Sequence, residues 1–191
     1  MPVSLYTPRL VIRLATQDDI GDLLTHFRNN QDFLTPFEPT RPPDFYTYRY
    51  WRSQVARSFE QYQNGQALRL IMVERSAPRQ TTGRIIGTIN FTSFVYYPFY
   101  CCTLGYGLAE DKEGQGLMQE ALTVSINYVF NAMQCHRIQA NYMPRNQRSG
   151  NLLARLGFRI EGDAKDYLLI NGVWEDHILT SLINSHWKPI V

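Results

Sequence analysis

The chain is poor in cysteine, and this shortage excludes two kinds of architecture. It contains three cysteines among 191 residues, at Cys101, Cys102 and Cys135, and none of them forms a C-x-x-C pair. Neither a disulfide framework nor a cysteine-based metal site is therefore expected. The isolated Cys135 suits a small buried apolar residue better than a catalytic thiol.

Net charge and long apolar runs are also lacking. The 19 basic and 17 acidic residues leave a net charge of +2, which is too small to attract nucleic acid by bulk electrostatics. No run of about 18 apolar residues is present, so no membrane span is expected. The first residues, "MPVSLYTPRLVIRL", lack the apolar core and cleavage site of a signal peptide. We therefore expect a cytoplasmic protein.

What is present is the composition of one globular domain. Hydrophobic residues make up 44% of the chain and charged residues 19%, and the length suits a single core. With no internal repeat, low-complexity tract or linker, we expect one domain over residues 1–191. The aromatic run "FVYYPFY" is compatible with either a partner surface or the core. It leaves open whether the chain forms a homodimer.

The hydrophobic period changes along the chain and predicts a mixed α/β domain, in the order β-α-α-β-β-β-α-β-α-β-β. Thr16 and Asp19 form a capping box at the start of the first helix. The four prolines of "FLTPFEPTRPPDF" predict a stiff loop without regular structure, and "SAPRQTTG" predicts a polar turn. Asn171-Gly172 is a strong hairpin signal. The expected strands are 10–16, 68–74, 83–97, 103–110, 136–142 and two within 158–183, and the expected helices are 16–30, 47–64, 116–132 and 146–157.

The stretch "EDKEGQGLMQEA" places two glycines, Gly114 and Gly116, just before a helix. The first N–H groups of a helix have no internal partner and carry partial positive charge. Glycines allow a phosphate to reach these groups without meeting a Cβ atom, so the stretch indicates an anion site, with a plain tight turn as the alternative. The P-loop motif is absent, and Gln119 replaces the third glycine of a dinucleotide fingerprint.

The six residues from Asp111 to Gly116 resemble the acetyl-CoA motif of the GNAT N-acetyltransferases, [Gln/Arg]-x-x-Gly-x-[Gly/Ala], with Asp111 replacing Gln or Arg. The segments "EALTVSINYVF", "HRIQANYMPRNQRS" and "LLARLGFRIEG" follow in the order seen in the ribosomal-protein alanine N-acetyltransferases. This resemblance runs from "TPRLVIRL" to "DYLLINGVWEDHILTSL". It implies the GNAT acyl-CoA N-acyltransferase fold, in which helices flank a splayed central mixed β-sheet.

The resemblance also implies acetyl-CoA as cosubstrate, with no metal, and a set of residues that hold it. The backbone before and within the glycine turn would bind the pantetheine arm and the pyrophosphate. Gly105 and Gly107 are compatible with a bulge that opens the sheet, or with close packing against a helix. Glu120 suits a helix-dipole or packing role. The expected cofactor-binding residues are Leu108, Ala109, Lys112, Glu113, Gly114, Gln115, Gly116, Leu117, Met118, Asn146 and Ser149.

Two polar residues at the start of a short helix carry the expected chemistry. Family members use the asparagine of "N-x-x-S", here Asn146, to bond the cofactor arm. Ser149 would then lie near the thioester sulfur and protonate the leaving thiolate. Helix capping is the alternative for both residues. Many GNAT enzymes carry a tyrosine acid where this chain has Leu153, so Ser149 would replace it.

The amine side of the reaction needs little help from a base. An N-terminal amine has a pKa near ~7.7–8.0, against ~10.4 for lysine, and this gap of about 2.5 units corresponds to some 3 kcal/mol. Glu38 is the first candidate to bind or deprotonate the amine and Asp166 is the second, with plain surface solvation as the alternative. Phe37, Tyr106 and Tyr142 are expected to line the substrate cleft, although strand tyrosines usually pack in the core.

The resemblance implies direct transfer of acetyl, in a ternary complex, to the N-terminal alanine of a small-subunit ribosomal protein. Such a partner does not require nucleic-acid binding by this chain. Two alternatives stay open: an acetyltransferase for a free amine, such as a polyamine or an aminoacyl compound, and a non-catalytic CoA-binding module on the ribosome. A polyamine pocket should be rich in acids, and the loops here offer few.

Overall fold

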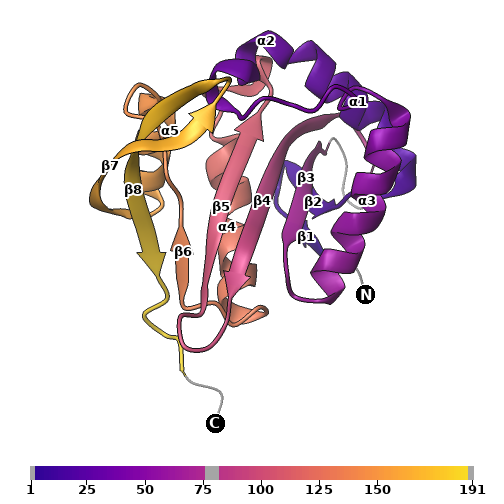
Figure 1. Ribbon diagram of the computed structural model, residues 1–191. Helices are drawn as coiled ribbons and strands as arrows, with labels where there is room; N and C mark the ends of the chain where they lie inside the picture. The colour runs from indigo at the N-terminus through magenta and orange to yellow at the C-terminus, as the bar shows by residue number, and fades with distance from the viewer. Residues whose placement is uncertain (1–2, 76–81, 189–191) are drawn as a thin grey trace.

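The extended segments of the chain pair into a single eight-stranded sheet (Figure 1). The computed structural model describes residues 3–75 and 82–188, and the predicted turn "SAPRQTTG" lies largely outside them. Neighbouring strands follow the order β1-β2-β3-β4-β5-β6-β8-β7, and only β5 and β6 pair in parallel. The strands are β1 (Ser4–Tyr6), β2 (Leu10–Leu14), β3 (Leu68–Glu74), β4 (Ile85–Val95), β5 (Cys101–Leu108), β6 (Arg137–Gln139), β7 (Arg159–Ile170) and β8 (Val173–Ile183).

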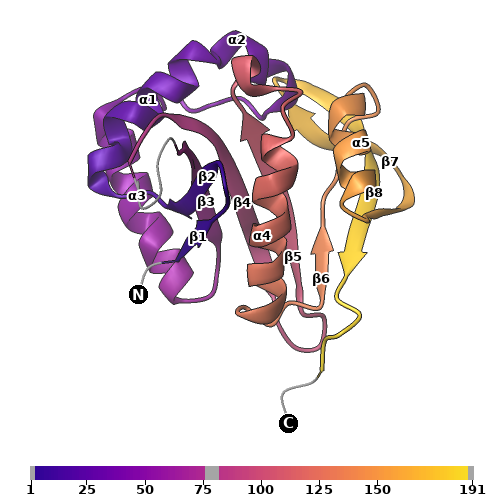
Figure 2. The ribbon, with the colours of Figure 1, turned by 180° about the vertical axis from the view of Figure 1, so that it is seen from behind.

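Helices cover both faces of this sheet because its inner strands are apolar on both sides. Ile71 and Val73 pack under α1 and α3, whereas Leu70 and Met72 pack on the face that α4 covers. Figure 2 shows α4 and α5 together on that second face. The helices are α1 (Ile20–Asn29), α2 (Gln31–Leu34), α3 (Tyr48–Gln63), α4 (Leu117–Asn131) and α5 (Gln147–Arg155), with 3-10 turns η1 (Gln17–Asp19), η2 (Thr35–Phe37) and η3 (Glu110–Lys112).

Two local sequence predictions, a helix cap and a hairpin turn, are confirmed. Thr16 and Asp19 form the predicted capping box, in which the carboxylate of Asp19 accepts from the backbone N–H of Thr16 at 2.7 Å. The hydroxyl of Thr16 also donates to this carboxylate, at 2.9 Å. Asn171 and Gly172 both have positive φ, of 45° and 82°, and join β7 to β8 as a hairpin.

Three expectations about elements are wrong. The proline-rich loop begins with helical turns, α2 and η2, because Pro36 stands in the first turn of η2, where a helix needs no N–H donor. The strand expected at 136–142 pairs as β6 over three residues only. The first strand, β1, carries no clear alternation and was not expected.

The sheet opens between β5 and β6. The two strands pair only where Cys101–Thr103 face Arg137–Gln139. Beyond this point the chain after β6 leaves β5 and turns toward β8, so that Tyr142 bridges to Ile178. Residues 104–108 of β5 then keep β4 as their only strand neighbour in the described chain. The splayed sheet predicted from the family resemblance is thereby confirmed.

The sheet opens without a bulge at the two glycines of β5. Gly105 pairs with Asn90 and Gly107 with Thr88 in unbroken register. The irregularity between β4 and β5 lies farther along, between Thr92 and Val95. None of the helices in the described residues is long and apolar enough to cross a lipid bilayer.

Candidate active site

A cavity of about 900 Å³ occupies the opening between β5 and β6. Its wall combines residues from α2, η2, β4, β5, the glycine turn, α5 and β8. Most of the residues expected from the sequence meet there although they are far apart along the chain. Those that line the cavity are Phe37, Glu38, Tyr106, Leu108, Glu113, Gly114, Gly116, Leu117, Met118, Tyr142, Asn146 and Ser149.

The cavity is lined from both faces of the sheet. Tyr106 points toward α5, because its hydroxyl lies 2.8 Å from Oγ of Ser149. Since side chains alternate along a strand, Gly105 and Gly107 face the opposite side. A Cβ atom at Gly107 would lie 4.0 Å from Oε1 of Glu38, which belongs to that side. The glycines therefore keep β5 bare beneath Glu38.

The glycine turn leaves the start of α4 uncovered. Gly114 and Gly116 both have positive φ, of 72° and 74°, a conformation that favours glycine. A Cβ atom at Gly114 would meet nothing within 4 Å, and one at Gly116 would meet only Arg9. The N–H groups of the first turn of α4, from Leu117 onward, are consequently accessible to an anion.

Arg9 holds this turn in place from outside the cavity. It donates from Nη1 to the carbonyl of Gln115 at 3.0 Å and from Nε to Glu120 at 2.7 Å. Burial opposes the charge of Glu120, but hydrogen bonds from Thr7 and Arg9 hold the pKa of that carboxyl below its usual value. The packing role expected for Glu120 is confirmed.

Three residues expected to bind the cofactor do not line the cavity. Ala109 is fully buried, and its N–H donates to the carbonyl of Ile86 at 2.7 Å. Lys112 pairs instead with Glu74 at 2.6 Å. Gln115 lies outside the lining too, with its carbonyl bonded to Arg9.

Asp111, which replaces the usual Gln or Arg of the motif, is neutralised by Arg84. The guanidinium donates to both carboxylate oxygens, at 2.7 and 2.8 Å. The hydrogen bonds from Arg84 hold the pKa of Asp111 below its usual value and raise the pKa of Arg84. The negative charge beside the glycine turn is thereby balanced. This partner stands just before β4, far from Asp111 in the sequence, so the motif could not reveal it.

Ser149 and Tyr106 form a hydroxyl pair in the cavity wall. Burial raises the pKa of Tyr106 to about 12, against a smaller lowering by the hydrogen bond with Ser149, so the phenol keeps its proton at neutral pH. When Tyr106 donates to Oγ of Ser149, the serine proton is free to point into the cavity. The sequence predicted Tyr106 in the wall of the cleft, where the structure places it, and the bond to Ser149 is an addition that the sequence did not reveal.

Asn146 is a helix cap as well as part of the cavity wall. Its Oδ1 accepts from the N–H of Ser149 at 3.2 Å. The next turn packs tightly, since a Cβ atom at Gly150 would lie 2.6 Å from the ring of Tyr142. Tyr142 thus sets the position of α5 relative to the sheet. The contact between Asn146 and a cofactor stays a prediction.

Glu38 is held by an arginine in an aromatic cage. Arg41 donates to Oε2 of Glu38 from Nε at 3.0 Å and from Nη2 at 2.5 Å. The guanidinium lies 5.0 Å from the ring centre of Phe27 and 4.6 Å from that of Phe45. Glu38 is therefore oriented rather than simply solvated.

The second carboxylate candidate, Asp166, is not brought to this site. It lies on β7 outside the cavity lining, and its N–H donates to Asp176 at 3.0 Å. Cys135 is buried outside the lining as well, with its sulfur 3.7 Å from that of Cys102. Within residues 3–75 and 82–188, no three His, Cys, Asp or Glu side chains gather as metal ligands would.

Other cavity residues were missed by the sequence motifs. Arg148 of α5 forms an ion pair with Glu113 of the glycine turn, and its guanidinium lies 5.4 Å from the ring centre of Phe33. Asn90 on β4 and His177 on β8 also line the cavity. Strand residues of these types carry no local signal, because only the pairing of distant strands brings them to the opening.

Comparison with known proteins agrees with this geometry. The family model for the acetyltransferase (GNAT) domain matches residues 9–159. The [ribosomal protein uS5]-alanine N-acetyltransferase of Escherichia coli is 42% identical over 98% of this chain and 94% of its own. The crystal structure of the ribosomal-protein-S5-alanine acetyltransferase from Vibrio fischeri has a TM-score of 0.91 at 38% identity, covering 98% of this chain and all of the other. RimJ of Mycobacterium smegmatis, in complex with CoA-disulfide, has a TM-score of 0.82 at 26% identity, covering 91% and 81%.

Proposed function

The chain belongs to the GNAT acetyltransferase family, and we propose that it transfers acetyl from acetyl-CoA to an N-terminal alanine of a small-subunit ribosomal protein in the cytoplasm. The observation that carries this proposal is the cavity that joins the two faces of the splayed sheet. It joins a glycine turn suited to phosphate and a hydroxyl pair on one side to an oriented carboxylate on the other. The similarity to the E. coli enzyme supports the choice of acceptor.

The cosubstrate would be held mainly by backbone groups. The pyrophosphate would accept hydrogen bonds from the free N–H groups at Gly114 and at the start of α4. The pantetheine arm would lie along the open edge of β5, where residues 104–108 pair with no strand of the described chain on the side of β6. Asn146, in the wall of the same cavity, would bond an amide of the arm.

Transfer then proceeds by direct attack in a ternary complex. The lone pair of the neutral α-amine forms a bond to the thioester carbonyl carbon, and the C–S bond breaks as the tetrahedral intermediate collapses. Ser149 donates a hydrogen bond to the departing thiolate, and the bond from Tyr106 orients its hydroxyl for that purpose. The attacking nitrogen gives up one proton as the amide forms, and the thiolate takes one from solvent on release.

Glu38 binds the incoming amine. Its Oε2 is occupied by Arg41, whereas Oε1 lies beside the bare glycine of β5. An ammonium or amine at that place would donate to Oε1 while resting against β5. Arg41 keeps the carboxylate in position and is itself fixed by the rings around it.

The acceptor class is tested by thiol release from acetyl-CoA. The substrates are a peptide with a free N-terminal alanine, the same peptide with its N-terminus blocked, and spermidine. We expect release with the free peptide only. The carboxylates in the cavity wall, Glu38 and Glu113, are both paired with arginines, and this disfavours a polycation. Faster release with spermidine would contradict the peptide acceptor, and CoA binding without any release would contradict catalysis.

A further inference from the structure

His177 lies in the wall of the active-site cavity with one ring nitrogen already bonded. Its Nδ1 is 2.9 Å from the backbone carbonyl of Glu175. A carbonyl oxygen can only accept a hydrogen bond, so Nδ1 carries the proton. In the neutral imidazole the lone pair therefore lies on Nε2.

The second nitrogen, Nε2, is uncommitted. No hydrogen bond to it exists within the described residues, although the residue as a whole is only 4% exposed. Within the described residues, the side-chain polar atoms that are fully buried and make no hydrogen bond belong to His26, Trp51, His136 and Arg137. Nε2 of His177 is not among them, so this atom is not fully buried. Its remaining accessible surface is thus within reach of the cavity that His177 lines.

The strand register places His177 on the face of the sheet where Glu38 would bind the amine, called the amine side below. Tyr142 pairs with Ile178, and the ring of Tyr142 packs against Gly150 on the face that α5 covers. Directly paired residues point to the same face, and the next residue along a strand points to the other. His177 therefore faces the same side as Glu38 and the bare glycines of β5.

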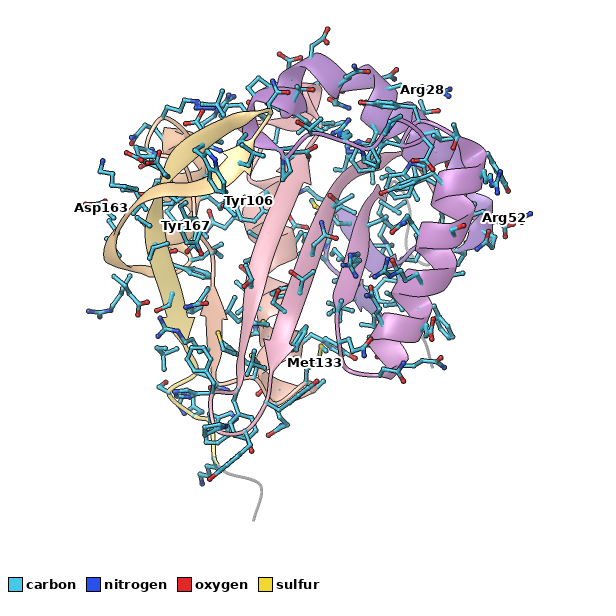
Figure 3. All side chains as sticks on the ribbon, in the orientation of Figure 1. Arg28, Arg52, Tyr106, Met133, Asp163 and Tyr167 are labelled. Carbon is cyan, nitrogen blue, oxygen red and sulfur yellow. The ribbon has the colours of Figure 1, made fainter. Side chains whose placement is uncertain are left out.

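The imidazole is held on both sides by the neighbouring structure. Its ring centre is 5.3 Å from that of Tyr167, whose hydroxyl accepts from Asn141 at 3.0 Å. Figure 3 shows Tyr167 and Tyr106 near the place where the sheet opens. The side chain of Glu175 is tied by Arg145 at 2.8 Å, which steadies the strand that supplies the carbonyl for Nδ1.

We propose that His177 is the catalytic residue that takes the proton of the attacking amine. As the N–C bond forms, the amine nitrogen becomes positively charged, and Nε2 accepts its proton to give an imidazolium. The C–S bond then breaks, CoA leaves as the thiolate, and the imidazolium returns its proton to water. This role rests on the proposed function, and it leaves Glu38 to bind the amine.

The test uses the full-length protein with acetyl-CoA and the alanine peptide. Activity of the wild type with this peptide establishes the proposed function separately. We expect His177→Gln and His177→Ala to lower kcat by about 100-fold, within the range of general base catalysis, with Kd for CoA unchanged. Added imidazole should restore part of the rate of His177→Ala. The matched control, His136→Gln, alters a histidine outside the cavity lining that packs on Trp187, and it should keep wild-type kcat.

Two results would overturn the role of His177 while leaving the proposed function intact. One is wild-type kcat in His177→Gln. The other is a rate of His177→Ala that imidazole leaves unchanged although the variant is folded and binds CoA. A merely structural histidine predicts the second result, because imidazole supplies a proton acceptor but repairs no packing.

Discussion

Replacing Gly114 by alanine should separate the binding function of the glycine turn from its structural role. The φ of Gly114 is 72°, and a side chain in this conformation costs about 1–2 kcal/mol, partly offset by about 0.4–1 kcal/mol from the stiffer unfolded chain. The new methyl group meets no protein atom within 4 Å. The net loss in free energy of unfolding should be about 1 kcal/mol, or a fall of roughly 2–4 °C in Tm for a chain of this size.

The same methyl group would stand in the cavity where the pyrophosphate approaches the backbone. Loss of one hydrogen bond to a charged group costs about 1.5–3 kcal/mol, which corresponds to a rise in Kd of roughly 10- to 150-fold. Calorimetric titration with CoA measures this effect, and thermal unfolding without CoA measures the strain.

Gly172 provides the matched control. Its φ is 82°, a Cβ atom there would also meet nothing within 4 Å, and it lies at the hairpin outside the cavity lining. Gly172→Ala should lose similar stability and bind CoA like the wild type. Equal CoA affinities for Gly114→Ala and Gly172→Ala would refute the assignment of the turn as the phosphate site.

Three further predictions concern catalysis, cofactor charge and stability. Ser149→Ala should lower kcat by about 10- to 100-fold with little change in Kd for CoA, and an unchanged kcat would remove its role. Arg84→Ala leaves Asp111 unbalanced beside the phosphate site, so Kd for CoA at low salt should rise by roughly fivefold and recover when Asp111→Asn is added. Burial raises the pKa of Asp19, but the hydrogen bonds from Arg13 and Thr16 and the charge of Arg13 together outweigh it and hold that pKa below its usual value. The stabilisation by ionised Asp19 is present above the pKa of this residue in the unfolded chain, near ~3.9. It is lost as the pH falls through the lower pKa in the folded chain. Asp19→Asn should therefore cost about 2 kcal/mol in urea unfolding at pH 7 and progressively less toward pH 3, and a constant difference would contradict the ion pair.

Much of the fold could be predicted because its signals are local. The capping box at Thr16 and Asp19 and the hairpin at Asn171-Gly172 depend on a few adjacent residues, and both are confirmed. The proline-rich segment was misjudged for a related reason. A proline such as Pro36 ends some helices and begins others, and only its position in the turn distinguishes the two cases.

The candidate site could be predicted only in part. The glycine turn and the cap at Asn146 are contiguous motifs, and the structure brings both to the cavity. The sequence offered Asp166 as the second carboxylate after Glu38, yet its strand places it outside the cavity, where its backbone N–H donates to Asp176. Side chains of one chemical type cannot be ranked until the strands that carry them are placed.

The sequence by itself determined that the helix start at Gly114 and Gly116 carries no Cβ atom and can adopt positive φ, since both follow from glycine alone. Only the tertiary structure decided that Tyr106 meets Ser149 and that His177 faces the amine side. The physical reason is the short pairing of β5 with β6. Where two strands separate depends on the packing of α5 and β8 across the whole sheet, and no local pattern encodes that distance.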